Sequence, residues 1–441
     1  MSIVSVSEAW NHGISFADIS DVGMRRSNNQ DSHAVVLADS PERFGLCGHL
    51  FVVADGMGAH AAGELASRMA IDRIASTYFR GGSQLPSDEF AAIDLLRASV
   101  DQANEEIHRR GQENPEFHNM GTTASAMAII PDGAIIAHVG DSRIYRLRGD
   151  MLDQLTFDHS LVWEMEASGQ VHPNSALGQS IPKNVITRSL GPNPNVQVDS
   201  EGPFPVAPGD TFLLCSDGLS GQVDDEEIGA ILSCLPVDEA ARVLVDLANL
   251  RGGPDNSTVI IARVDRMPDG STTPPARPAA DTQRVVSGLF PSAAVACLLG
   301  AGVLAFAGMY QSMVIAILLG LSAAITSIVQ MQLSAKPANN RLRNDHPGGG
   351  RAPYRRYNAK PSDSLNEKLR TTVDELRRAA DEKCWEMDWR EVEKHQRTAE
   401  QAVSNGQFAE AVRHQAEAII ATMQQLREQH DRAAGETAID N

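Results

Sequence analysis

Four aspartates stand at the ends of apolar runs in glycine-rich surroundings: Asp55, Asp141, Asp217 and Asp255. Short apolar runs bounded by turn residues are typical of buried strands, so these acids are expected to meet at the rim of a sheet. Crowded carboxylates repel one another, and divalent cations with oxygen ligands are the usual remedy. The pattern therefore predicts metal-dependent catalysis, although each aspartate alone could simply favour a turn.

An arginine pair, Arg25 and Arg26, lies five or six residues before Asp31, which precedes another predicted strand. The guanidinium fork matches the geometry of a phosphate group. An exposed arginine pair is usually solvated surface, but its nearness to a further carboxylate favours phosphoester binding.

The acidic side chains are unevenly distributed along the 441 residues. Residues 336–441 hold 18 basic and 18 acidic side chains, so the net charge of −19 arises in residues 1–335. An acidic N-terminal part argues against nucleic acid as a partner. The five cysteines are scattered without a CxxC pair, which indicates neither a zinc site nor a disulfide framework, and a reducing cytosol is expected for the soluble parts.

Residues 285–335 contain no charged side chain. One membrane span needs about 20 residues, so this run fits two transmembrane helices within residues 285–333, near 289–307 and 313–329. The alternative is a buried hairpin inside a soluble domain, but so long an uncharged stretch is rare there.

The flank that follows is rich in lysine and arginine, which is typical of the cytoplasmic side of a membrane. A hairpin returns to the side it left, so we expect a two-pass protein of the inner (cytoplasmic) membrane with both termini in the cytoplasm. The same basic residues could also contact anionic headgroups of the lipid bilayer.

Residues 12–265 are predicted to form one domain of α+β class, because helical stretches are grouped between runs of consecutive strands. A Pro-rich linker (266–284) and a basic Gly/Pro linker (334–361) flank the membrane segment. Residues 362–435 show helical spacing interrupted at 405–407, which predicts a helical hairpin or a coiled coil. This tail is either a module for partner binding or self-association, or a self-contained helical cap.

Residues 12–265 resemble the metal-dependent protein phosphatases of type 2C, in their bacterial serine/threonine form. The matching blocks follow one another in order: SDVGMRRSNNQD (20–31), VVADGMGAHAAGELAS (52–67), GTTA (121–124), HVGDSRIYRLR (138–148), LTFDHS (155–160), NVITRSLG (184–191), LLCSDGL (213–219) and PDNSTVI (254–260). The resemblance implies a four-layer α-β-β-α sandwich of two packed antiparallel sheets flanked by helices.

The resemblance also implies the metal ligands. Asp55 matches the acid that bridges two Mn²⁺ or Mg²⁺ ions, with the Gly56 carbonyl as a further ligand. Asp217 and Asp255 match the other direct ligands, and Asp141 with Asp217 matches a third site.

Three more residues take their roles from the same resemblance. Asp31 matches an acid that supports metal-bound water, and Arg26 aligns with the phosphate-binding arginine. Met57 stands where some members carry a proton-donating histidine, and His60 could replace it; otherwise His60 is a hydrogen-bonding group at a helix N-terminus.

The function implied is a membrane-anchored phosphatase that hydrolyses phosphoserine and phosphothreonine in cytoplasmic proteins by attack of a metal-bound hydroxide, opposing a protein kinase. Residues 161–183 correspond to the mobile flap of the family. Two alternatives stay open: an inactive or weakly active phosphoprotein-binding scaffold of the same fold, and a hydrolase for small phosphoesters.

Overall fold

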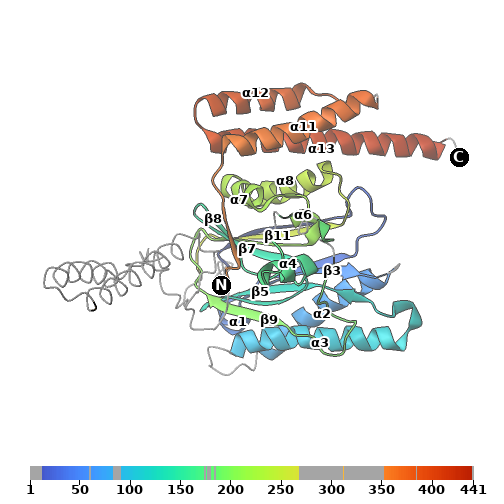
Figure 1. Ribbon diagram of the computed structural model, residues 1–441, viewed down its shortest axis with the longest axis vertical. Helices are drawn as coiled ribbons and strands as arrows, with labels where there is room; N and C mark the ends of the chain where they lie inside the picture. Colours follow the sequence, from blue (N-terminus) through green and yellow to red (C-terminus); the bar gives the residue numbers. More distant parts are fainter. Residues whose placement is uncertain are drawn as a thin grey trace, which may run out of the picture. The chain divides into compact units, whose positions relative to one another are not determined.

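The computed structural model describes residues 12–58, 61–82, 91–172, 175, 180–182, 185–267, 311, 352–383 and 385–439. Two antiparallel sheets form its centre (Figure 1). In the first sheet the strand order is β1 (Ile14–Asp21), β11 (Ser257–Val264), β10 (Thr211–Cys215), β7 (Arg143–Arg148), β8 (Met151–Gln154) and β12 (Arg355–Asn358). In the second it is β2 (Asp31–Val36), β3 (His49–Met57), β5 (Ala124–Ile130), β6 (Gly133–Val139) and β9 (Asp199–Phe204), with the short β4 (Gly121–Thr122) paired to β3.

The alternation of side chains along each strand explains why the two sheets stack. In β10, Phe212 and Leu214 enter the core between the sheets, whereas Leu213 and Cys215 face the other way. Successive strand residues point to opposite faces, so a strand that is apolar throughout must be covered on both.

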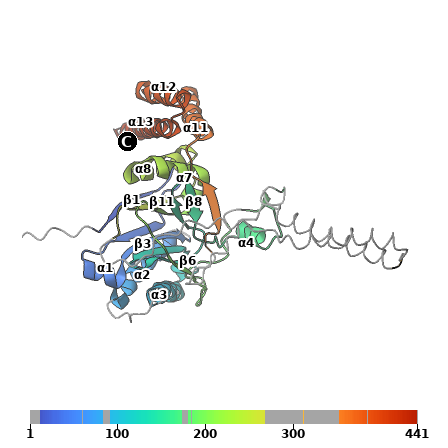
Figure 2. The same ribbon diagram turned by 90° about the vertical axis from the view of Figure 1, so that its left-hand side faces the viewer.

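Helices cover the outer face of each sheet. The second sheet packs on α2 (Ala62–Gly82) and α3 (Ala91–Glu113), and the first on α7 (Asp225–Cys234) and α8 (Val237–Leu250). The shorter helices are α1 (Pro41–Cys47), α4 (Leu161–Ala167), α6 (Asp217–Ser220) and the 3₁₀ helix η1 (Pro115–Phe117). The α+β class and the four α-β-β-α layers are therefore confirmed (Figures 1 and 2).

The prediction that residues 334–361 form only a linker is wrong for the part that the structure describes. Residues 355–358 form β12, which pairs with β8 at the edge of the first sheet. Ala352 is buried in the core between the sheets, and Ala359 is buried beneath α7. A segment that follows the predicted membrane hairpin is thus part of the sandwich.

The tail contains three helices, not the predicted two: α11 (Asp363–Glu382), α12 (Arg390–Ser404) and α13 (Phe408–Ile439). The expected break at 405–407 is present. A second break precedes α12, because residues 385–389 are not helical. In this segment Trp389 packs against the core, and the centre of its ring lies 5.1 Å from Cζ of Arg377.

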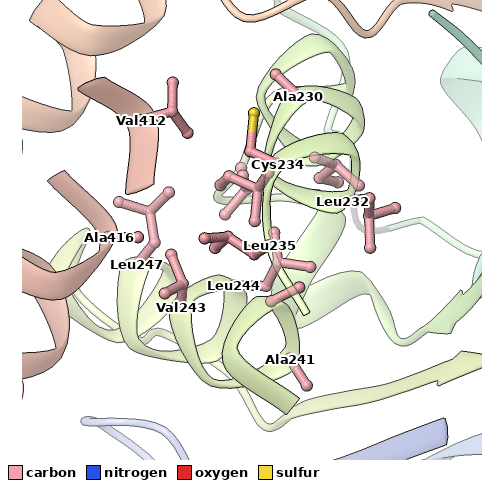
Figure 3. Packing of buried hydrophobic residues seen from close by; sticks show 14 of the residues in the cluster. Ala230, Leu232, Cys234, Leu235, Ala241, Val243, Leu244, Leu247, Val412 and Ala416 are labelled. Carbon is pink, nitrogen blue, oxygen red and sulfur yellow. The ribbon is translucent and has the colours of Figure 1, made fainter. Parts of the chain in front are cut away.

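The tail packs on its own chain as a further layer over α7 and α8. Val412 and Ala416 of α13 share one apolar cluster with Val243 and Leu247 of α8 (Figure 3). Beside this cluster, Arg427 donates to the buried carboxylate of Asp246 at 2.7 Å. The tail therefore covers apolar surface that the catalytic layers would otherwise expose.

Among the described residues, no helix is both long enough and apolar enough to cross a bilayer. The predicted spans at 289–307 and 313–329 lie outside those residues, so they stay a prediction.

Candidate metal and phosphate site

The second sheet brings Asp31 and Asp55 together at one edge. Asp31 begins β2, Asp55 lies near the end of β3, and the two residues are direct partners in the antiparallel register. Facing residues in such a pair have Cβ atoms about 5 Å apart. The pairing therefore places two carboxylates side by side.

The first sheet brings Asp217 and Asp255 together by the same means. Asp217 follows β10 and begins α6, Asp255 precedes β11, and the two strands are neighbours. A Cβ atom at Gly218 would lie only 1.9 Å from the Asn256 carbonyl oxygen. Glycine is required at this position because the two turns touch.

Asp141 lies in the turn from β6 of the second sheet to β7 of the first, so it bridges the two pairs. Its side chain is buried, as is that of Asp31. The structure thus gathers all five predicted carboxylates at one end of the sandwich.

Burial and mutual repulsion both disfavour the ionised carboxylates. Burial, with smaller contributions from Asp217 and Asp255, raises the pKa of Asp31 to about 6. Burial and the charge of Asp217 raise the pKa of Asp141 to about 8. Burial raises the pKa of Asp55 well above its usual value, and the charges of the other four aspartates raise it further.

The donor set fits divalent cations. Oδ1 of Asp31 and Oδ1 of Asp141 are buried without a hydrogen-bond partner, although buried polar atoms normally have one. Oxygen-only ligands of this kind suit Mg²⁺ and Mn²⁺. Gly56 adjoins Asp55, and a Cβ there would lie 2.2 Å from the Gly63 carbonyl oxygen and 2.5 Å from that of Gln30.

Hydroxyl groups hold the carboxylates from behind. Ser216 Oγ donates to Oδ2 of Asp31 at 2.7 Å, which fixes the carboxylate and leaves Oδ1 without a protein partner. The backbone amide of Asp55 donates to Thr123 Oγ1 at 2.9 Å, and the Asp55 carbonyl accepts from the Thr122 hydroxyl. These supporting hydroxyls were not predicted individually from the sequence.

Arg26 lies at the rim of this cluster. Its Nη2 donates to Asp255 Oδ2 at 2.7 Å, and its Nε donates to the Pro254 carbonyl. The loop that carries it is fixed by Asn256, whose Oδ1 accepts from the backbone amide of Gln30 at 2.8 Å. Both arginines are exposed, and the backbone amide of Arg25 bonds to the Gly253 carbonyl. The choice of Arg26 over Arg25 agrees with this geometry.

His60 and Cys215 are two further residues that could take part in the chemistry. His60 lies outside the described residues, so its role as proton donor stays a prediction. Cys215 is buried, and burial raises the pKa of its thiol to about 12. A thiol this far from ionisation is a poor nucleophile.

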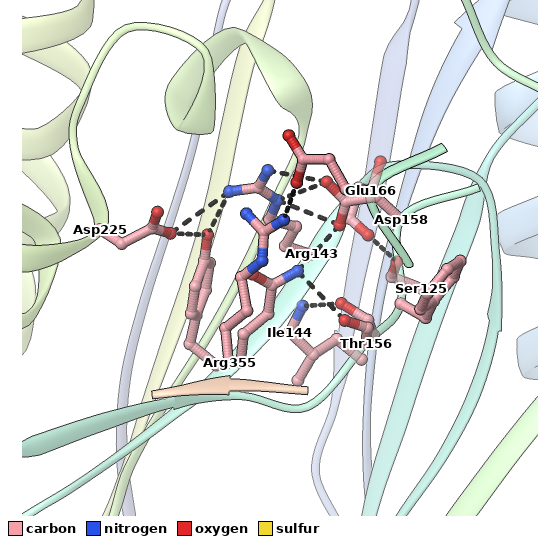
Figure 4. Close-up of polar contacts among 12 residues, drawn as sticks. Ser125, Arg143, Ile144, Thr156, Asp158, Glu166, Asp225 and Arg355 are labelled. Carbon is pink, nitrogen blue, oxygen red and sulfur yellow. Dashed lines mark hydrogen bonds and ion pairs between the residues drawn. The ribbon is translucent and has the colours of Figure 1, made fainter. Parts of the chain in front are cut away.

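The sequence analysis missed the polar network beside Asp141 (Figure 4). Arg143 binds Asp158 through Nε and Nη2, with the Nη2–Oδ2 distance at 2.7 Å, and its Nη1 contacts Asp225 at 3.3 Å. Arg143 lies within the HVGDSRIYRLR block, but its partners Asp158 and Asp225 follow it by 15 and 82 residues. Only the fold reveals this network.

Comparisons with known proteins agree with this site. Residues 24–246 match the family described as protein phosphatase 2C. The protein phosphatase PhpP of Streptococcus pneumoniae is 37% identical over 254 residues, which cover 56% of this chain and 96% of PhpP.

Two solved structures are similar to part of this chain. The serine/threonine phosphatase of S. agalactiae is 35% identical, with a TM-score of 0.51, and the match covers 57% of this chain and 99% of that one. The catalytic domain of the phosphatase PstP, solved with 2 manganese ions, is 34% identical, with a TM-score of 0.47 and coverage of 57% and 99%.

The raised pKa values predict that the stability of the metal-free protein depends on pH. Asp141 has a pKa of about 8 when folded but about 3.9 when unfolded, so its contribution to stability is complete below pH ~4 and is lost as pH rises toward 8. Cations displace the protons, so we expect Mn²⁺ to raise the melting temperature more at pH 8 than at pH 6. Thermal denaturation with chelator and with Mn²⁺ measures this, and an equal gain at both pH values would contradict it.

Replacing Arg26 should harm substrate binding more than replacing its neighbour. A charge-assisted hydrogen bond to phosphate contributes about 1.5–3 kcal/mol, so Arg26→Ala is expected to raise the KM for a phosphopeptide about tenfold or more. Arg25→Ala is the matched control and should change KM much less. Steady-state kinetics of both variants test this, and equal effects would refute the assignment.

Proposed function

The chain belongs to the protein phosphatase 2C family, and we propose that it acts as a membrane-anchored member of it that dephosphorylates cytoplasmic proteins. Its relatives show that it is a protein serine/threonine phosphatase. Dependence on Mn²⁺ or Mg²⁺ is supported by the carboxylate cluster, in which two buried oxygens lack a protein partner. The membrane anchor, the cytoplasmic substrates, the opposing kinase and the catalytic use of metal-bound water are the parts that we propose.

One observation supports turnover above all others: the five carboxylates are present together, and two of their buried oxygens lack a protein partner. A scaffold that only bound phosphoproteins would have no need to keep unpaired carboxylate oxygens at a cost in stability. The scaffold alternative therefore has no support in the site.

The carboxylates of the site have separate proposed roles. Asp55, Asp217 and Asp255, with the Gly56 carbonyl, would hold two cations, and Asp141 with Asp217 a third. Divalent cations held there would supply the means to activate water for hydrolysis of a phosphoester at neutral pH. Asp31, fixed by Ser216, would orient that water.

Arg26 would neutralise the phosphoryl oxygens as charge develops. It already donates to Asp255, so a phosphate next to the cations would lie within reach of the same guanidinium. The buried Cys215 offers no competing nucleophile, which favours direct hydrolysis over a phosphoenzyme.

The membrane anchor has indirect support from the residues that border it. Met267 and Ala352 both pack against the core between the two sheets. A chain that leaves and re-enters the domain at one core suits a hairpin that returns to the membrane face it left.

The activity is tested on the full-length protein in detergent, with a phosphothreonine peptide. We expect hydrolysis that requires Mn²⁺, stops with EDTA and falls at least 100-fold in Asp217→Asn, because a lost ligand removes several kcal/mol of transition-state stabilisation. Asp238→Asn, an exposed acid on α8, is the matched control. Activity that is indifferent to EDTA would overturn the mechanism.

The anchor is tested with sealed inside-out membrane vesicles. Added protease is expected to digest both the catalytic layers and the tail, because a hairpin leaves both on the cytoplasmic face. Protection of either part, or release of the full chain by a carbonate wash, would refute the two-pass arrangement. Neither result would bear on the phosphatase activity itself.

A further inference from the structure

Two histidines and a glutamate converge between α12 and α13, away from the catalytic carboxylates. His395 lies on α12, and His414 and Glu417 lie on α13. Nδ1 of His395 and Nδ1 of His414 are each 2.7 Å from the same oxygen, Oε2 of Glu417. One potential ligand atom from each residue lies within 4.8 Å of the others.

A carboxylate stands near the outer nitrogen of each ring, although beyond hydrogen-bond distance. Metal-binding histidines usually present their second nitrogen to a carboxylate, which fixes the ring and strengthens the ligand. His395 Nε2 lies 4.0 Å from Oε1 of Glu391, and His414 Nε2 lies 3.7 Å from Oε1 of Glu410. Each carboxylate stands one helical turn before its histidine.

Charge also favours a cation here. Three carboxylates surround two imidazoles, and Arg413 offsets only part of the negative charge through its contact with Glu410 at 3.3 Å. From these observations we propose that His395, His414 and Glu417 bind one transition-metal dication of the zinc class. Two nitrogens and one carboxylate oxygen leave a fourth position for water, and the ion would clamp α12 to α13.

The proposal is tested by zinc binding to the full-length protein, first stripped with chelator and then held in excess Mn²⁺ to occupy the catalytic centre. Calorimetric titration should give one Zn²⁺ more for the wild type than for the double variant His395→Ala/His414→Ala. His118→Ala, an exposed histidine beside η1, is the control and should behave as the wild type.

Two further readouts separate the outcomes. Phosphatase activity in Mn²⁺ should be unchanged in the double variant, which shows that it is folded, and Zn²⁺ should raise the melting temperature only when both histidines are present. Glu417→Gln keeps the helices intact and should weaken zinc binding. Equal zinc stoichiometry in the wild type and the double variant would show that the three residues only share hydrogen bonds.

An independent observation concerns β12, which reaches α4 beside the catalytic site. Arg355 Nη2 donates to Oε2 of Glu166 at 2.6 Å, and its guanidinium lies 3.6 Å from the centre of the Trp163 ring. Figure 4 shows Arg355 and Glu166 next to the Arg143 network. Trp163 is buried, so this contact covers one face of α4.

The segment just before α4 contacts the turn that carries Asp141. His159, two residues before α4, donates its backbone amide to the Gly140 carbonyl at 2.7 Å, and its Nδ1 accepts from the Gly140 amide. Phe157 packs on Trp163 from the same segment, with ring centres 5.5 Å apart. We infer that Arg355 is a positioning residue that holds α4, and through it the Asp141 turn, in place.

The conservative series Arg355→Ala and Arg355→Lys tests this role, with Arg356→Ala as control, since Arg356 binds Asp153 from the same strand. Arg355→Ala should speed hydrogen exchange in residues 161–167 and raise the KM for a phosphopeptide more than that for p-nitrophenyl phosphate. Lysine should restore part of both. If exchange in α4 stays unchanged, or if Arg356→Ala has the same effect, the role of Arg355 is only structural.

Discussion

The repulsion among five buried or half-buried aspartates is the constraint on which the rest of the structure depends. Folding brings them together and raises the pKa of Asp31, Asp55 and Asp141, chiefly by burial. Such an arrangement costs stability unless protons or cations compensate. The two stacked sheets supply the rigid frame that holds the acids close despite that cost.

Close backbone approach makes the frame possible. A Cβ atom at Gly218 would lie 1.9 Å from the Asn256 carbonyl oxygen, and one at Gly56 would lie 2.2 Å from that of Gly63. Neither position has room for a residue other than glycine. Hydroxyl groups of Ser216 and Thr123 then bind the strand ends from inside the sandwich. The aspartates are fixed before a cation arrives, so their oxygens need little reorganisation to bind one.

The sequence was sufficient to predict the aspartate cluster because each acid stands at one end of an apolar strand, and strand ends meet by register. Helical spacing likewise predicted helices grouped between the runs of strands. It could not give the partners of Arg143, because Asp158 and Asp225 join it through tertiary contacts. Charged partners that are distant along the chain leave no periodic signal.

The role of β12 was hidden for a different reason. A four-residue strand rich in arginine, following a Gly/Pro-rich stretch, has the composition of a linker. Its place is decided by the unpaired edge of β8 and by the pockets that receive Ala352 and Ala359. Edge strands are ready templates for pairing, and here the chain's own later segment takes that position.

The tail helices also cover a buried part of the sandwich. The helices α11 and α13 bury apolar residues against α8, and Arg427 lies over the fully buried Asp246. If the chain were cut after residue 267, that acid would lose one of its two arginine partners and the outer face of α8 would be exposed. The catalytic layers and the tail therefore form one folding unit, although a long segment separates them in sequence.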